Sequence, residues 1–146
     1  MSNILLRSIA PALNSALLAP RMLSVLRIVA GLAFLEHGTG KLLGFPARLP
    51  FIDKMPTGLM YFTGTMELVG GALIVLGLFT RPVAFILSGF MAAAYFMAHF
   101  PMSFFPALNF GEPAELYCFI FLYLAAAGRG RGRSTGADRS VGRCGE

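Results

Sequence analysis

The chain has 146 residues, of which 56% are hydrophobic and 13% charged, with a mean hydropathy of +0.70 and a net charge of +5. This composition leaves too little polar surface to cover a soluble domain and is typical of an integral membrane protein. The two cysteines, Cys118 and Cys144, have no C-x-x-C spacing, so dithiol chemistry within the chain, a structural disulfide and a zinc site are not expected.

Residues 1–20 carry apolar side chains at every fourth position, at Leu5, Ile9, Leu13 and Leu17. This spacing predicts a short interfacial helix as an N-terminal extension, interrupted near Pro11. A cleaved signal peptide is the alternative, but the continuous apolar core that such a peptide needs is missing.

Four apolar stretches follow, at residues 22–43, 59–79, 82–100 and 113–128. The first three approach the ~20 residues with which a helix crosses a hydrocarbon core of ~30 Å. The fourth would be only about 24 Å long at 1.5 Å per residue, so it must thin the bilayer or be extended by the aromatic residues 104–110. The prediction is an all-α integral membrane four-helix bundle, formed by residues 21–128.

The loops and small residues between these stretches add detail to the prediction. Loops 44–58 and 101–112 combine prolines with large apolar residues, which indicates interfacial anchoring or a lid. Within the stretches, spacings such as Gly89 to Ala93 predict close contact between helices. Four glycines of the second stretch are also expected to lie where helices contact each other: Gly64, Gly70, Gly71 and Gly77.

The arginines predict the orientation in the membrane. Eight of them flank the predicted inner ends of the helices: Arg7, Arg21, Arg81, Arg129, Arg131, Arg133, Arg139 and Arg143. The positive-inside rule then places both termini in the cytoplasm and the protein in the plasma (inner) membrane as a multi-pass protein. Residues 129–146 are expected to form a basic, disordered cytoplasmic tail. Its arginines could suggest nucleic-acid binding, but after a membrane span they are normally topology determinants and contacts for anionic lipids, so no nucleic-acid partner is expected.

Ionisable side chains interrupt the first apolar stretch at Glu36, His37 and Lys41. At bilayer depth each costs roughly 2.5–3.5 kcal/mol and needs a partner or a polar cavity. His37 and Lys41 are four residues apart, so they lie on one face of a helix. Arg27, nearer the cytoplasmic end, could extend its head group to the interface.

Ionisable residues of different stretches fall at a similar depth. His37 lies about 22 Å from the inner end of its helix, and Glu67 about 12 Å from the outer end of the next. In a core of ~30 Å these depths differ by about one helical turn. His99 and Glu115 lie near the outer ends of the third and fourth stretches. All four stretches therefore contribute an ionisable group to the outer half of the bundle.

The candidate ligand-binding cluster consists of His37, Lys41, Glu67, His99 and Glu115. Structural alternatives exist for Lys41 as an interfacial anchor, for Glu115 as a charge at a helix start, and for His99 as an interface histidine. Glu67 has no other charge in its own stretch, so it either pairs with His37 or Lys41 or is protonated. No catalytic residue is assigned.

Several motifs resemble those of the DoxX family of small four-helix membrane proteins. They are Arg27-x-x-x-Gly31, Glu36-His37-Gly38-Thr39-Gly40-Lys41-Leu42, Glu67-Leu68-Val69-Gly70-Gly71, Gly77-Leu78-Phe79-Thr80-Arg81, Asn109-Phe110-Gly111-Glu112-x-Ala114-Glu115 and Gly128-Arg129-Gly130-Arg131. The resemblance runs from about Arg21 to Asp138 and leaves out residues 1–20. The tail departs from the family pattern, because residues 133–138 replace its usual compact ending.

The resemblance implies a membrane subunit similar to part of a thiosulfate to quinone oxidoreductase, or a role in oxidative stress and in resistance to catechols or quinones. The family is also similar in fold to membrane chaperones and cargo receptors, so fold alone does not decide function.

The first hypothesis is a quinone-linked subunit of a membrane oxidoreductase or oxidative-stress system. His37, Lys41 and Glu67 would bind the quinone headgroup, and His37 and Glu67 could carry protons. The sequence holds no haem or flavin motif, so no intrinsic cofactor is expected besides a quinone, and electrons would come from a soluble or membrane redox partner. A non-enzymatic chaperone or assembly scaffold is the alternative, and a small-solute carrier is the third hypothesis. Membrane lipids and a second copy of the chain are the other expected partners.

Overall fold

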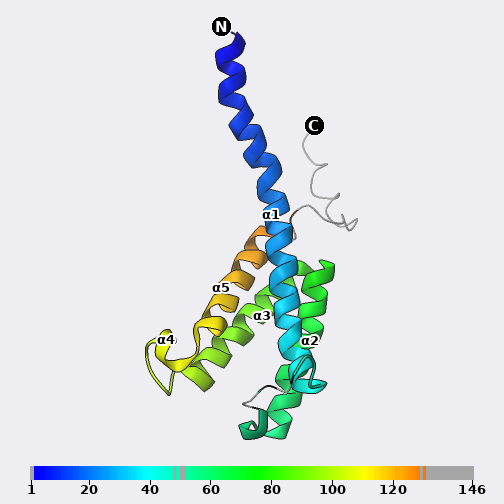
Figure 1. Cartoon of the computed structure of the whole chain (residues 1–146), viewed down its shortest axis with the longest axis vertical. Coiled ribbons are helices and arrows are strands. Elements are labelled where there is room, and N and C mark those ends of the chain that lie inside the picture. Colours follow the sequence, from blue (N-terminus) through cyan, green and yellow to red (C-terminus); the bar gives the residue numbers. More distant parts are fainter. Residues whose placement is uncertain (1, 48, 50–51, 129, 131–146) are drawn as a thin grey trace, which may run out of the picture.

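The computed structural model describes residues 2–47, 49, 52–128 and 130, with side chains from residue 18 onward. Within this part the chain is all-helical and contains no strand. The long helices are α1 (Ser2–Leu42), α2 (Thr57–Leu76), α3 (Thr80–Ala94) and α5 (Glu112–Ala127). Three short elements complete the fold (Figure 1): the 3-10 turn η1 (Ile52–Lys54), the π-helical turn η2 (Tyr95–His99) and α4 (Pro106–Asn109).

Three segments are long and apolar enough to cross a membrane: Leu18–Leu42, Thr57–Leu76 and Thr80–His99. The third of these continues from α3 through η2. The fourth predicted stretch forms α5, whose 16 residues correspond to about 24 Å of helix. The membrane character predicted from composition therefore has a structural basis in three helices, and the fourth span stays a prediction.

Helix α1 does not break where the sequence suggested. It runs without interruption for 41 residues, about 60 Å at 1.5 Å per residue, so the predicted interruption near Pro11 was wrong. A proline removes one backbone hydrogen bond, and the rest of this helix continues past it. The expected boundary between an extension and a first span, at residues 20–21, lies inside α1, which extends well beyond the other helices (Figure 1). The predicted cytoplasmic tail, residues 129–146, lies outside the described residues apart from Gly130.

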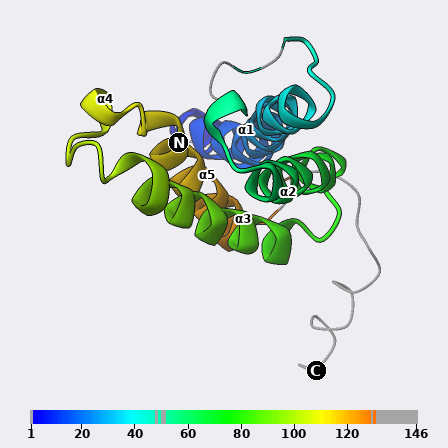
Figure 2. The ribbon, with the colours of Figure 1, turned by 90° about the horizontal axis from the view of Figure 1, so that it is seen from below.

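The long helices pack as two pairs. Helix α1 packs chiefly on α2, and α3 chiefly on α5, with fewer contacts between the pairs. Figure 2 shows the two pairs side by side. Phe34 of α1 joins them in the core, because its ring packs edge-on against Phe121 of α5 and Phe90 of α3.

Glycines set the close approach of α1 to α2. A Cβ atom added at Gly38 would lie 2.5 Å from the backbone nitrogen of Leu68, and one added at Gly71 would lie 2.8 Å from that of Leu35. Neither side could hold a larger residue without moving backbone, so the contact expected for Gly71 is confirmed. Gly89 behaves differently, since no described atom lies within 4 Å of its added Cβ. The close helix contact predicted at Gly89 was therefore wrong.

Two arginines bind the carbonyl ends of helices. Arg27 is buried and donates to the carbonyl oxygens of Ile74 and Val75 at the end of α2, the latter at 2.7 Å. Arg81 donates to the carbonyl oxygen of Ala126, near the end of α5, at 3.3 Å. Cations favour these positions because the last carbonyls of a helix lack partners and carry partial negative charge. Arg27 thus turns inward to α2 instead of reaching the interface as the sequence suggested.

Candidate functional site

The best-defined polar contact in the bundle is an ion pair between α1 and α2. Lys41 Nζ lies 2.5 Å from Glu67 Oε1, and both side chains are only 8% exposed. The same ammonium group donates to the hydroxyl oxygen of Thr63 at 3.4 Å. Lys41, Thr63 and Glu67 face each other because one turn of α2 separates Thr63 from Glu67 and because the glycine contact brings the two helices close together. Of the two partners that the sequence allowed for Glu67, Lys41 is the one in direct contact.

Glu67 retains an unused acceptor. Its second carboxylate oxygen, Oε2, is buried and has no hydrogen-bond partner among the described residues. A buried polar atom without a partner costs about 1–3 kcal/mol, and more when it is charged. Such atoms are uncommon and call for an explanation, for example a bound ligand or water.

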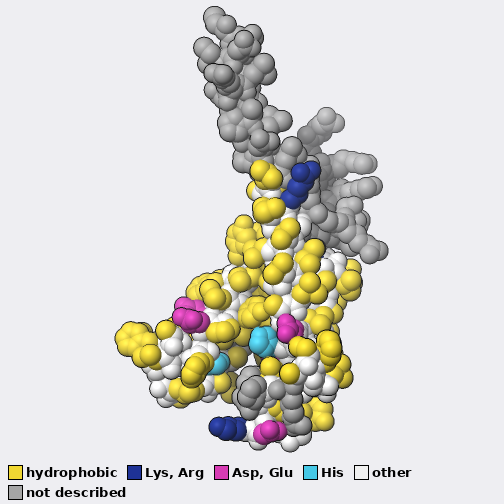
Figure 3. All heavy atoms as spheres, viewed as in Figure 1, with side chains coloured by type: hydrophobic (Ala, Val, Ile, Leu, Met, Phe, Trp, Pro, Cys, Tyr) yellow, Lys and Arg dark blue, Asp and Glu magenta, His cyan; other side chains and the backbone are white. Residues whose placement is uncertain are grey.

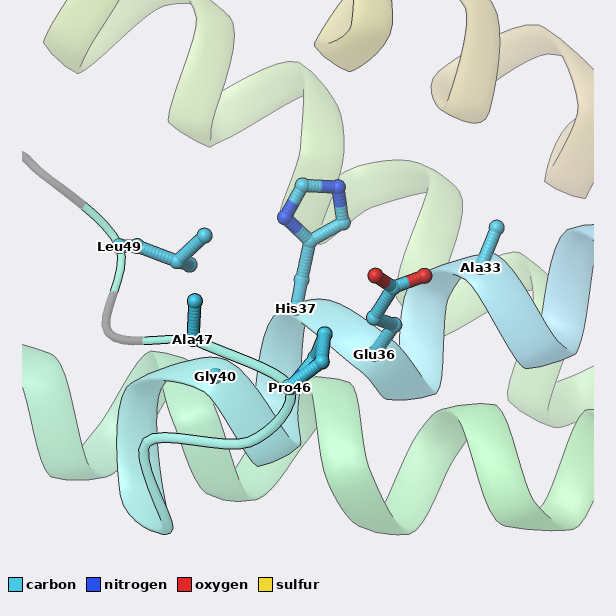
Figure 4. A pocket seen from close by; sticks show the side chains of 7 residues that line it. All are labelled: Ala33, Glu36, His37, Gly40, Pro46, Ala47 and Leu49. Carbon is cyan, nitrogen blue, oxygen red and sulfur yellow. The ribbon is translucent and has the colours of Figure 1, made fainter.

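A pocket lies on the face of α1 that is turned away from α2. Its volume is about 290 Å³, and its lining combines two turns of α1 with part of the loop 44–58: Ala33, Glu36, His37, Gly40, Pro46, Ala47 and Leu49. The side chains of Glu36 and His37 project from the same side of α1 (Figure 4), while the loop residues close the opposite wall. The pocket is thus mostly apolar, with one carboxylate and one imidazole.

His37 links this pocket to the buried pair. It is half-buried, lines the pocket, and is close enough to interact electrostatically with Glu67. Its ring also meets the ring of Tyr117 on α5 edge-on, with centroids 6.2 Å apart. One side of His37 therefore faces the pocket, and the other faces the interior where α1, α2 and α5 meet.

The other two residues of the predicted cluster lie elsewhere. His99 Nδ1 is 3.0 Å from the carbonyl oxygen of Asn109, and the His99 ring stacks on Tyr95. Asn109 is fully buried, donates to the carbonyl oxygen of Ser103 at 2.8 Å and accepts from Gly111 N at 2.7 Å. This network orders the loop 101–112 without contacting His37, Lys41 or Glu67.

Glu115 is exposed on α5, and its side chain makes no hydrogen bond or ion pair with any residue that the structure describes. The structure thus brings together three of the five predicted residues, His37, Lys41 and Glu67. No group of three or more His, Cys, Asp or Glu residues suited to a metal ion occurs in the described part of the chain.

Two residues at this site were missed in the sequence. Tyr117 did not stand out because it carries no charge at neutral pH; it lies five residues into α5, about 8 Å along the axis, a depth not far from that of Glu67. Glu36 was recognised as a costly charge but was left out of the cluster, although it lines the pocket beside His37.

The surroundings of the site are strongly apolar. Figure 3 shows a surface made mostly of hydrophobic side chains, with only a few charged and histidine side chains among them. Exposed residues include Phe85, Phe96 and Leu116, each more than 60% accessible. Such a surface is expected where lipid tails replace water, so the polar groups at His37 and Glu67 are the exception in an otherwise lipid-like setting.

Comparison with known proteins adds the following. The DoxX family model matches residues 22–100. An uncharacterized protein of Haemophilus influenzae is 44% identical over 102 residues, which cover 67% of this chain and 76% of that protein. A Bacillus subtilis protein named "Putative oxidoreductase CatD" is 34% identical over 61 residues, which cover 40% of this chain and 46% of that protein. No solved structure matches the chain. The matched range 22–100 includes Glu36, His37, Lys41 and Glu67, whereas Tyr117 lies beyond it.

Proposed function

The chain belongs to the DoxX family, and from that premise we propose that it is a quinone-linked membrane component of an oxidoreductase or oxidative-stress system. The name of the Bacillus relative assigns oxidoreductase chemistry to that protein, and the proposal extends this class of chemistry to the present chain. The observation that carries it is the unused hydrogen-bonding capacity between the pocket and the buried ion pair.

The hydrogen-bonding groups at the site are of the kinds that a quinone headgroup needs. Glu67 Oε2 is buried without a hydrogen-bond partner among the described residues, while the half-buried imidazole of His37 and the exposed carboxylate of Glu36 lie in the pocket wall and are free to bind a ligand. A quinone ring presents two carbonyl acceptors, and its reduced form presents two hydroxyl donors. A mostly apolar pocket with a few polar groups is the usual form of a small-molecule site. His37 can donate to a carbonyl, and Glu36 can accept from a hydroxyl.

His37 and Glu36 can also transfer the protons that quinone reduction requires. Reduction of a quinone takes up two electrons and two protons and yields the quinol. His37 is suited to exchange a proton near neutral pH, and Glu36 beside it can receive or release one from the pocket. The electrons come from a redox protein partner that carries its own cofactor, because the chain has no haem or flavin motif of its own.

The orientation in the membrane is part of the proposal. Arg27 near the start of the first span binds the end of α2, and Arg81 in the α2–α3 turn binds the end of α5. These contacts support a four-helix arrangement in which the basic ends lie together on the cytoplasmic side. The pocket and the two outer loops then lie in the opposite half of the plasma membrane.

The test is the quinone content of the protein purified from its native membrane in a mild detergent. We expect bound quinone in the wild type, loss of it in His37→Gln, and retention of it in Glu115→Gln, which alters an exposed residue outside the site. Wild-type protein free of quinone, but purified with a stable membrane partner, would instead favour the chaperone or scaffold hypothesis.

A further inference from the structure

The proposed quinone site needs a second hydrogen-bond donor besides His37. Lys41 was the candidate from the sequence, but its ammonium group already binds Glu67 at 2.5 Å and Thr63 at 3.4 Å. Releasing Lys41 to a ligand would leave the buried carboxylate of Glu67 without its counter-charge, at a considerable cost. A donor that is not committed to another residue is therefore the better candidate.

Tyr117 is such a donor. Its hydroxyl makes no hydrogen bond with any residue in the described part of the chain, although the side chain is half-buried. Its ring meets the ring of His37, which lines the pocket, with centroids 6.2 Å apart. The hydroxyl oxygen is accessible and is not sealed in the core, so it can donate to a ligand that lies beside His37.

The ring of Tyr117 is held in place from several sides. It lies 5.3 Å from the ring of Phe34 and stacks on Phe121 at 5.7 Å, and the ring of His37 meets it edge-on. Phe34 and Phe121 are almost fully buried. The position of the hydroxyl oxygen is therefore fixed before any ligand binds, which lowers the entropic cost of using it.

The other tyrosines do not share these properties. The hydroxyl of Tyr95 contacts the carbonyl oxygen of Phe104 and the amide of Asn109. Tyr61 and Tyr123 are 56% and 57% exposed on the outer surface. Among the four tyrosines of the chain, Tyr117 is the one that combines a free hydroxyl with contact to the proposed site.

We infer that Tyr117 donates a hydrogen bond from its phenolic hydroxyl to one carbonyl oxygen of a bound quinone, while His37 donates to the quinone from the pocket side. The quinone site is then formed by α1 and α5 together. This inference rests on the proposed function and names the residue that would fix the orientation of the headgroup. Because the phenol and the imidazole both donate, the oxidised form of the ligand is the one that this pair recognises.

The experiment compares Tyr117→Phe with the wild type and with Tyr123→Phe, a matched control on the outer surface of the same helix. Binding of a benzoquinone with a decyl tail is measured in detergent, together with binding of decylbenzene, which lacks both carbonyl groups. We expect Tyr117→Phe to weaken quinone binding about three- to tenfold, the effect of one hydrogen bond, and to leave decylbenzene binding unchanged. Tyr123→Phe should bind both probes as the wild type does.

Infrared spectroscopy supplies a readout that packing alone would not change. A hydrogen bond to a quinone carbonyl lowers its stretching frequency, so the bound quinone should show a shifted band in the wild type that moves back in Tyr117→Phe. The variant should keep the thermal midpoint of the unliganded wild type, because the deleted hydroxyl has no protein partner and the ring contacts remain.

The outcomes separate this inference from the function on which it rests. If the wild type and Tyr117→Phe bind the quinone equally well and show the same carbonyl band, Tyr117 is not the donor while the quinone site stands. Equal weakening for quinone and decylbenzene would show that the residue acts through shape, which also overturns the inference. Failure of the wild type to bind the quinone at all overturns the proposed function and the role of Tyr117 with it.

Discussion

Replacing Glu67 by glutamine should be among the most destabilising single changes in the bundle. The substitution keeps the size of the side chain but leaves the ammonium group of Lys41, 8% exposed, without its counter-charge. At 2.5 Å and an effective dielectric constant of about 20, the direct attraction is roughly 6–7 kcal/mol before desolvation is subtracted. Breaking a buried pair by removing one partner typically costs about 3–5 kcal/mol, and we expect a loss of that size.

A double-mutant cycle measures the coupling. Lys41→Met should cost less than Glu67→Gln, because a carboxyl group without a partner can take up a proton and avoid a buried charge. The double variant should be more stable than the sum of the singles predicts, by roughly 2 kcal/mol. The free energy of unfolding is measured for all four proteins by denaturant titration in one detergent. Glu115→Gln serves as the control and should stay within about 0.5 kcal/mol of the wild type.

Additivity of the two single effects within about 0.5 kcal/mol would refute this reasoning, because residues in direct contact do not contribute independently. The same cycle with His37→Gln in place of Lys41→Met should give a smaller coupling energy, since His37 interacts with Glu67 without a hydrogen bond between them.

Three further predictions concern topology, packing and chemistry. With the native cysteines replaced, Met102→Cys should react with an impermeant thiol reagent added to intact cells and Ser134→Cys should not, and the reverse result would invert the proposed orientation. Gly38→Ala should destabilise the protein by about 1–3 kcal/mol, because its Cβ would meet the backbone of Leu68. The matched change Gly89→Ala, in open space, should be neutral or stabilising by up to about 1 kcal/mol. Equal unfolding midpoints for the two variants would contradict the close approach of α1 to α2. The purified chain in liposomes with a quinol and an artificial electron acceptor should show no turnover above the protein-free background, and clear turnover would mean that no redox partner is required.

Helical rise explains which parts of the site could be predicted from the sequence. The rise per residue fixes depth, so counting from the ends of the apolar stretches placed His37 and Glu67 within about one helical turn of each other. The four-residue spacing of His37 and Lys41 placed both on one side of α1. Together these two rules pointed to Lys41 and Glu67, which form the buried pair, and to His37, which lines the pocket.

The rotation of each helix about its own axis could not be predicted in this way. His99 has a suitable depth, but η2 and the loop 101–112 turn it toward Asn109. The glycines on α1 and α2 determine which faces of these helices meet, and only the assembled pair shows that Lys41, instead of His37, reaches Glu67. The pocket was equally beyond prediction, since it needs Pro46, Ala47 and Leu49 to fold back over α1.

The energetics of the buried pair favour a functional explanation over a structural one. Apolar residues of similar volume often stabilise a protein at least as well as a buried ion pair does, and two bundled helices in a membrane need no charge to associate when glycines allow close packing. Here the pair carries the additional cost of Glu67 Oε2, which is buried without a partner. Close by are an imidazole, a second carboxylate and a phenol, none of them hydrogen-bonded through its side chain to another described residue. Stability alone does not account for the buried, unpartnered oxygen of Glu67, and the imidazole and carboxylate in the pocket wall are placed to bind a ligand with carbonyl and hydroxyl oxygens.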